Sequence, residues 1–136
     1  MQGMELDLSQ ALAPLRHEIA GLAGVYLFGS QAAGDARPDS DIDLAFYAGA
    51  PVSRALVLDL QQRTANALMR DVDLVDLASA STILQMQVLR EGRLVEVLHP
   101  RSIGEFELRV LRDYDDLKRR RAEIEADVIA RGRVYG

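Results

Sequence analysis

Cysteine is absent from this chain of 136 residues, which excludes a disulfide framework and a metal site built on thiolates. No apolar run approaches the roughly 20 residues of a membrane-spanning helix, and the acidic N-terminal segment MQGMELDLSQ lacks the apolar stretch of a signal peptide. A soluble, cytoplasmic protein without a membrane partner is therefore expected. Lysine and arginine number 16 against 21 acidic residues, for a net charge of -5. We therefore expect no direct binding to nucleic acid, which needs a basic surface.

The chain is long enough for one domain, and 49% of its residues are hydrophobic, which suffices for a single core. We expect that domain to span residues 1–136. Apolar residues recur at helical and at strand periods in alternation, which predicts an α/β (α+β) fold. Pro14 should mark the first turn of a helix or a kink. The expected helices cover residues 8–22, 53–69, about 81–89 and about 102–131, and the expected strands cover residues 24–28, 42–46, 72–77 and 93–98.

The last expected helix is long for a domain of this size. Ser102 and Glu105 have the spacing of a capping box, and apolar residues then follow at helical spacing as far as Val128. A helix of roughly 30 residues spans about 45 Å, so the core should lie within about residues 1–98 while part of the extension projects from it. Arg121 interrupts the apolar stripe, which favours an acidic partner over a second copy of the same helix.

The segment LFGSQAAGDARPDSDIDLAF, residues 27–46, places carboxylates where a strand should begin. Side chains alternate along a strand, so Asp41 and Asp43 share one face while their apolar neighbours face the core. Two close carboxylates repel each other unless a cation intervenes, and Mg2+ prefers carboxylate oxygens together with phosphates. If the strand at 72–77 is a neighbour, Asp73 adds a third carboxylate to this face, whereas Asp76 lies on the opposite face by parity.

Other interpretations of this segment fit less well. An EF-hand loop that starts at Asp39 would need glycine where Leu44 stands and glutamate where Ala50 stands. A Walker A loop that starts at Gly29 would need lysine where Asp35 stands. A solvated acidic turn would explain the loop, but not the carboxylates that alternate with apolar residues into the strand.

Gly29 and Ser30, followed by ten residues and then DID from Asp41, resemble the G-S-x10-D-x-D motif of minimal nucleotidyltransferases with the polymerase-beta-like fold. The resemblance includes a strand before the glycine, Ser40 before the first carboxylate, and a later VDLV that carries the third acid. The tail segments REGRLVEV and FELRVLRDYDDLK look like the antitoxin branch, the MNT partners of HEPN toxins. The resemblance covers most of the chain. It implies a mixed sheet of about four strands flanked by helices, with a long C-terminal helix.

The resemblance also implies an activity. Gly29, Ser30 and Ser40 would bind the nucleotide, which is ATP. The carboxylates that would bind Mg2+, as two ions, and act in catalysis are Asp41, Asp43 and Asp73. In the family, AMP passes from ATP to a tyrosine hydroxyl of the HEPN ribonuclease toxin and neutralises it, in what are called type VII toxin–antitoxin systems. The implied partners are therefore ATP and a HEPN toxin.

Two alternatives remain open. The turn GSQAAG has Gln31 and Ala33 where many relatives carry a basic residue, as in G-S-x-A-R-G, so one phosphate contact is missing unless Arg37 or a partner residue replaces it. The protein could then mask its toxin without catalysis. It could also be a nucleotidyltransferase for a small molecule, but such relatives usually have a second helical domain, and only one helix is expected after Leu98.

Overall fold

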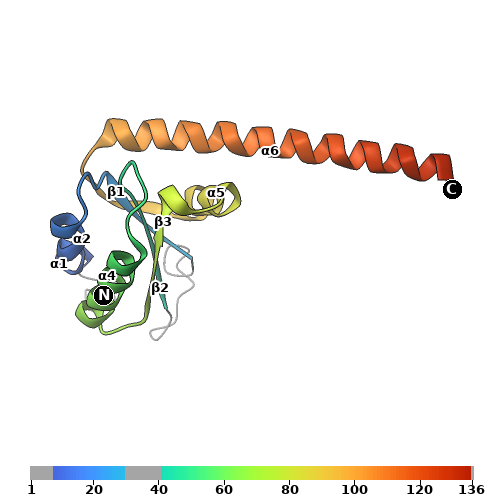
Figure 1. Ribbon diagram of the computed structural model, residues 1–136. Helices are drawn as coiled ribbons and strands as arrows, with labels where there is room; N and C mark the ends of the chain where they lie inside the picture. Colours follow the sequence, from blue (N-terminus) through green and yellow to red (C-terminus); the bar gives the residue numbers. More distant parts are fainter. Residues whose placement is uncertain (1–7, 30–40, 136) are drawn as a thin grey trace.

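The computed structural model describes residues 8–29 and 41–135, with side chains described up to residue 132 (Figure 1). A mixed sheet of four strands lies at its centre, with helices on both faces and one long helix at the C-terminal end. This is the architecture that the sequence predicted. Within the described ranges, no helix is both long and apolar enough to cross a membrane.

The strands follow the order β3-β2-β1-β4 across the sheet. Their bounds are β1 Gly24–Phe28, β2 Ile42–Tyr47, β3 Val72–Asp76 and β4 Arg93–Val97. β1 pairs antiparallel with β2 and with β4, whereas β2 pairs parallel with β3. A parallel pair needs a crossover connection, and α4 (Arg54–Leu68) supplies it. β3 is therefore an edge strand with one open side.

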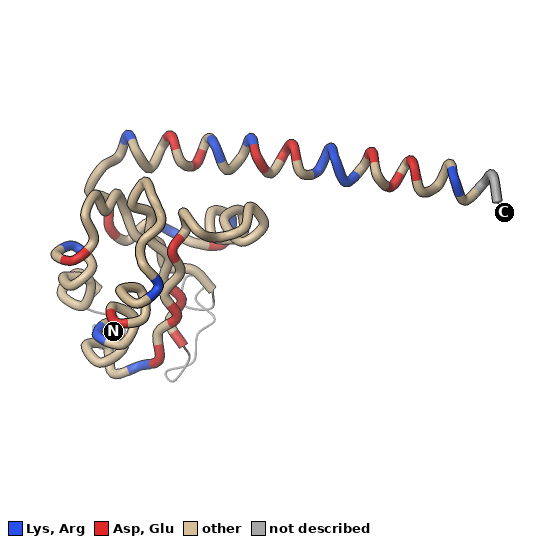
Figure 2. Tube along the Cα trace, viewed as in Figure 1, with Lys and Arg blue, Asp and Glu red and all other residues tan. Residues whose placement is uncertain are grey.

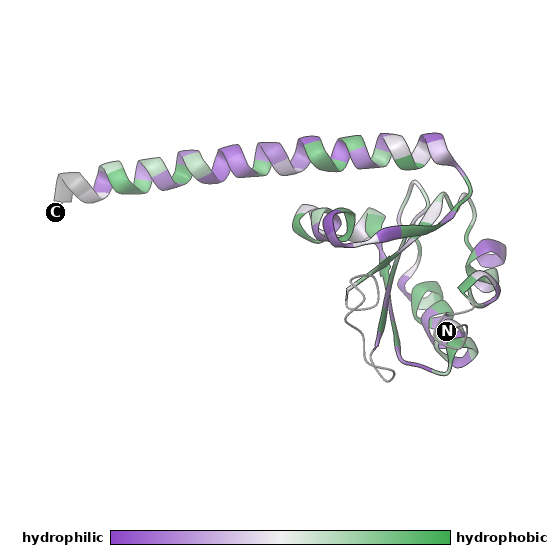
Figure 3. Ribbon diagram, turned by 180° about the vertical axis from the view of Figure 1, so that it is seen from behind, coloured by the Kyte–Doolittle hydropathy of each residue, from purple (hydrophilic) through white to green (hydrophobic). Residues whose placement is uncertain are grey.

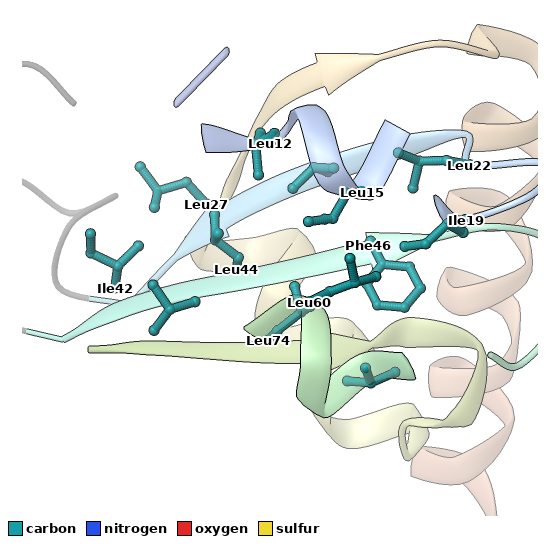
Figure 4. Packing of buried hydrophobic residues seen from close by; sticks show 13 residues of the cluster. Leu12, Leu15, Ile19, Leu22, Leu27, Ile42, Leu44, Phe46, Leu60 and Leu74 are labelled. Atoms are coloured by element: carbon teal, nitrogen blue, oxygen red, sulfur yellow. The ribbon is translucent and has the colours of Figure 1, made fainter. Parts of the chain in front are cut away.

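One face of the sheet packs against α1 (Leu8–Ala11), α2 (Ala13–Glu18) and α4. Figure 4 shows four apolar residues in and beside the N-terminal helices packing against strand residues that include Leu44 and Phe46; the four are Leu12, Leu15, Ile19 and Leu22. The first helix is divided in two, because Pro14 lies in the first turn of α2, where its missing N–H costs no hydrogen bond. The predicted alternation in β2 is confirmed by the complete burial of Phe46 on this face.

The other face is covered by η2 (Leu77–Ser79), α5 (Thr82–Glu91) and the first part of α6 (Pro100–Tyr135). Phe106 of α6 stacks on Tyr47 of β2 with ring centroids 4.1 Å apart, and Arg109 donates a hydrogen bond to the Tyr47 hydroxyl at 2.8 Å. Tyr26 donates to Glu107 at 2.6 Å. Burial raises the pKa of Tyr26, and its bond to this carboxylate raises it further. These contacts fix the base of α6 on the sheet.

Beyond this base, α6 projects away from the sheet, as Figures 1 and 3 show. Its 36 residues correspond to about 54 Å, and its exposed apolar residues include Leu117, Ile124 and Val128. Acidic and basic residues are interspersed along it (Figure 2). The predicted capping box at Ser102 is wrong, because the helix begins at Pro100 and Ser102 lies inside its first turn. Proline suits the first helical position, where its N–H would be unpaired in any case.

The ends of α4 and α5 follow the sequence signals, whereas α2 ends at Glu18, four residues before the predicted end of the first helix at Leu22. Ser53 caps α4, Ser81 caps α5, and Gly92 ends α5. β3 is one residue shorter than predicted, because the carboxylate of Asp76 caps η2. Leu77 therefore begins a 3-10 turn instead of extending the strand.

Candidate active site

The predicted site lies at the end of the sheet where β1 ends and where β2 and β3 begin. Phe28 is the last residue of β1, and Gly29 follows it directly. Across the antiparallel pair Phe28 lies opposite Asp43, and across the parallel pair Asp43 lies opposite Asp73. The fold thus brings together segments that are far apart in the sequence.

Asp43 and Asp73 share one face of the sheet, as strand alternation predicted. Their neighbours Leu44 and Leu74 are buried on the opposite face, against α4. Asp43 is half-buried and Asp73 is exposed, so a ligand can reach both carboxylates from solvent. Asp41 is exposed and precedes β2, so the ladder of the sheet does not fix it.

Gly29 is in closer contact with this site than the sequence indicated. Its φ of 72° lies in the left-handed region that favours glycine. A Cβ at this position would lie 2.2 Å from Oδ2 of Asp43, so any other residue would displace the carboxylate. The motif predicted a glycine that lets the backbone approach a phosphate. The geometry adds that glycine leaves room for Asp43 itself.

The pKa of Asp43 reflects both its burial and the negative charges of the site. Burial raises the pKa of the Asp43 carboxyl, and the charges of Asp73 and then Asp41 raise it further. A cation near these carboxylates would act in the opposite direction, because positive charge favours the ionised form. The electrostatics of the site therefore favour a cationic ligand.

Mg2+ fits the chemistry of these donors, since it binds one or two carboxylates together with the phosphates of a substrate. Asp41, Asp43 and Asp73 are the residues that would hold it. Within residues 8–29 and 41–132, no three Asp, Glu or His side chains are grouped closely enough to hold an ion as they stand. The strand register fixes the backbone of Asp43 and Asp73, so the complete set requires rotation of side chains, above all that of the exposed Asp41.

Asp76 has a different role, in agreement with its position on the face of β3 opposite to that of Asp73. It is 9% exposed. Its Oδ2 accepts hydrogen bonds from the Val52 N–H at 2.8 Å and the Ser79 hydroxyl at 3.3 Å, and its Oδ1 accepts from the Ala78 N–H at 3.1 Å. Hydrogen bonds of this kind are what make a buried carboxylate tolerable. Asp76 therefore ties the segment before α4 to the turn after β3.

The residues of the turn between β1 and β2 lie outside the described part of the chain. They include Ser30 and Ser40, which the sequence predicted to contact the nucleotide, and Gln31, Ala33 and Arg37. Their roles stay predictions.

Sequence reasoning missed a groove beside the carboxylates. It has a volume of about 300 Å3 and lies along the open edge of β3, lined by Asp73, Arg54 and Ser79 together with apolar residues. The one sequence feature that points to this groove is Arg54, which lies in the first turn of α4. The helix dipole disfavours a positive charge at that end of a helix.

The chain is similar to known proteins in sequence and in fold. The family described as polymerase beta, nucleotidyltransferase matches residues 12–97. The protein adenylyltransferase MntA of Shewanella oneidensis is 36% identical over 127 residues, which cover 93% of this chain and 90% of the relative.

Solved structures are similar over nearly the whole chain. A chain in a crystal structure of a toxin–antitoxin pair with AMP-PNP has 35% identity and a TM-score of 0.80, with 91% of this chain and 99% of that chain covered. A chain in the complex of a tri-AMPylated Shewanella oneidensis HEPN toxin with an MNT antitoxin has 33% identity and a TM-score of 0.74, with 95% and 99% covered. The motif, the sheet and these matches together show that the chain belongs to the polymerase beta family of nucleotidyltransferases.

Proposed function

We propose that this protein transfers AMP from ATP to a tyrosine hydroxyl of a HEPN-type toxin and so neutralises it, in the cytoplasm, where ATP is available. The observation that carries the proposal is the alignment of Asp43 with Asp73 on one sheet face, beside Gly29. This alignment supports a site for Mg2+ and a triphosphate. The similarity to a protein adenylyltransferase over 93% of the chain supports AMP as the group transferred and a protein as the acceptor.

Each residue of the site has a different role in the proposed reaction. Gly29 lets the backbone approach the triphosphate. Asp41, Asp43 and Asp73 would hold Mg2+, which would neutralise phosphate charge and activate the attacking oxygen. Asp73 lies on the edge strand and faces the acceptor. The tyrosine oxygen attacks the α-phosphorus, the bond to pyrophosphate breaks, and Asp73 takes up the hydroxyl proton.

In this proposal residues 1–98 form the catalytic core, and α6 docks the toxin. The projecting part of the helix exposes Leu117 and Ile124, and a long apolar stripe of this kind needs a partner to cover it. A groove of about 610 Å3 beside the start of α5 combines these two residues with Lys118 and Arg121. Glu125 also lines the groove, but its basic side chains outnumber this single acid. Its apolar residues and its excess of positive charge suit an acidic amphipathic segment of the toxin.

Labelled ATP tests the proposal. The protein is incubated with its cognate toxin and Mg2+, and the label that enters the toxin is measured and mapped. We expect the double variant Asp41→Asn, Asp43→Asn to lose transfer while it stays folded. Asp71→Asn, which removes an exposed carboxylate just before β3, should transfer normally. Equal transfer by the double variant would contradict the metal assignment.

The other functions give different results in the same assay. If the protein only masks its toxin, the wild type transfers no label and the double variant still protects cells. If the acceptor is a small molecule, the label appears in a small product instead of the toxin. The similarity to a protein adenylyltransferase over 93% of the chain favours the protein acceptor.

A further inference from the structure

The groove along the open edge of β3 extends from a carboxylate of the site toward a cation. Asp73 and Asp76 are three residues apart, which is about 10 Å along a strand. The hydrogen bond from the Val52 N–H to Asp76 holds the start of α4 beside the far end of the strand. Arg54 follows at this point and lines the same groove as Asp73.

Neither side-chain packing nor an ion pair within the fold explains why an arginine stands at position 54. It is exposed and lies in the first turn of α4, where the helix dipole makes a positive charge unfavourable. Among the residues that the structure describes, its guanidinium makes no hydrogen bond and no ion pair. A residue that is unfavourable in its local structure, and that no contact within the fold compensates, is expected mainly at functional positions.

The walls of the groove are preformed. Asp76 is hydrogen-bonded both to Val52 before α4 and to Ser79 after β3, which fixes the two sides relative to each other. Gln61 accepts a hydrogen bond from the Leu74 N–H at 2.9 Å. The edge strand is therefore already paired at this position, and a partner strand cannot extend the sheet there. A segment that enters the groove must bind through its side chains.

We propose that this groove holds the acceptor segment of the toxin, with the acceptor hydroxyl at Asp73 and an anionic group of the same segment at Arg54. The inference rests on the proposed function. Apolar Val57, Leu74 and Leu84 also line the groove and suit the ring of the acceptor side chain. The anionic group is a carboxylate of the segment or the phosphate of an AMP already attached, since a related HEPN toxin occurs in a tri-AMPylated form.

Steady-state kinetics with labelled ATP and the cognate toxin test the proposal. Arg54→Ala is compared with Arg63→Ala, a control on the same helix that is exposed and lies outside the groove. We expect Arg54→Ala to raise the KM for the toxin about 10-fold, the factor that a charged hydrogen bond contributes, and to leave the KM for ATP unchanged. Arg54→Lys keeps the charge and should recover part of the loss. The melting temperature of Arg54→Ala should be unchanged or higher, because an unfavourable charge at the helix start is removed.

The kinetics also distinguish the two sources of the anionic group. A slower first addition of AMP identifies a carboxylate of the toxin, and a slower later addition alone identifies the attached phosphate; both results support the proposal. Unchanged toxin kinetics in Arg54→Ala would overturn it. A higher KM for ATP alone would overturn it as well, because Arg54 would then contact the triphosphate. No transfer by the wild type would overturn the proposed function itself, and that result is distinct from a failure of the groove alone.

Discussion

Replacement of Asp43 by asparagine should make the protein more stable and nearly inactive. Asp43 lies directly opposite Asp73 on one face of the sheet. A directly opposed cross-strand pair is worth about 0.2–1 kcal/mol, so removal of the repulsion should raise the free energy of unfolding by about that amount. The melting temperature should rise by about 1–4 °C. Transfer of AMP should fall by about 100-fold or more, because the loss of even an indirect metal contact costs about 10–100-fold.

The gain in stability should depend on pH. The pKa of Asp43 is higher in the folded chain than in the unfolded chain. Protonation of Asp43 therefore contributes stability that is fully present below the unfolded pKa and is lost as the pH rises through the folded pKa. Asparagine carries no charge at any pH, so the difference between Asp43→Asn and the wild type should grow as the pH rises through this range and should vanish in acid. Thermal melts at several pH values, without divalent ions, measure this difference.

Two controls accompany these melts. Asp71→Asn removes an exposed carboxylate near the site but leaves the opposed pair in place, so its melting temperature should stay close to that of the wild type. Added Mg2+ should stabilise the wild type more than Asp43→Asn, because a ligand of the folded state stabilises by mass action. A lower melting temperature for Asp43→Asn at neutral pH without Mg2+ would refute the reasoning, because Asp43 would then make a favourable contact.

Further substitutions separate structural from functional residues. Asp76→Ala should lower the free energy of unfolding by about 1.5–3 kcal/mol in urea denaturation, because the hydrogen bonds to a buried carboxylate are lost. Asp73→Ala removes the same repulsion as Asp43→Asn, so it should raise the free energy of unfolding by a similar amount while it abolishes transfer. Loss of activity only in Asp76→Ala would mean that the assigned strand register is wrong. Gly29→Ala should cost about 1–3 kcal/mol and should also reduce transfer, because its Cβ would displace Asp43. Phe106→Ala should cost about 3–5 kcal/mol, because the ring is 1% exposed. Truncation before Lys118 should leave the melting temperature and ATP binding unchanged and abolish co-purification with the toxin; a truncated protein that still binds the toxin would place the interface elsewhere.

The sequence predicted the face of Asp43 and of Asp73 because alternation along a strand is a local property, whereas Asp41, which was expected on the same face, precedes β2. Asp43 and Asp73 each alternate with apolar residues, and the structure places both on the face opposite Leu44 and Leu74. Whether the two strands are neighbours depends on the order of strands in the sheet. Periodicity carries no information about that order, so the sequence predicts that these carboxylates meet only if the two strands are neighbours.

Other features of the site arise from contacts that sequence spacing does not encode. The need for glycine at Gly29 comes partly from the position of the Asp43 carboxylate, which belongs to another strand. The groove at β3 exists because Asp76 joins two distant segments. Ser102 had the correct spacing for a cap, but Pro100 starts the helix two residues earlier. Arg54 is the one part of the groove that the sequence does mark, since a cation in the first turn of a helix is unfavourable.

The central claim is tested most directly by the intact mass of the cognate toxin after incubation with this protein and ATP. With Mg2+ present, the mass of the toxin should increase by whole AMP units, and fragmentation should place the modification on a tyrosine. When a chelator removes the metal, or when Asp41→Asn, Asp43→Asn replaces the wild type, the mass should not change. A toxin that is neutralised by the wild type while its mass stays unmodified would contradict the account and would identify the protein as a masking partner.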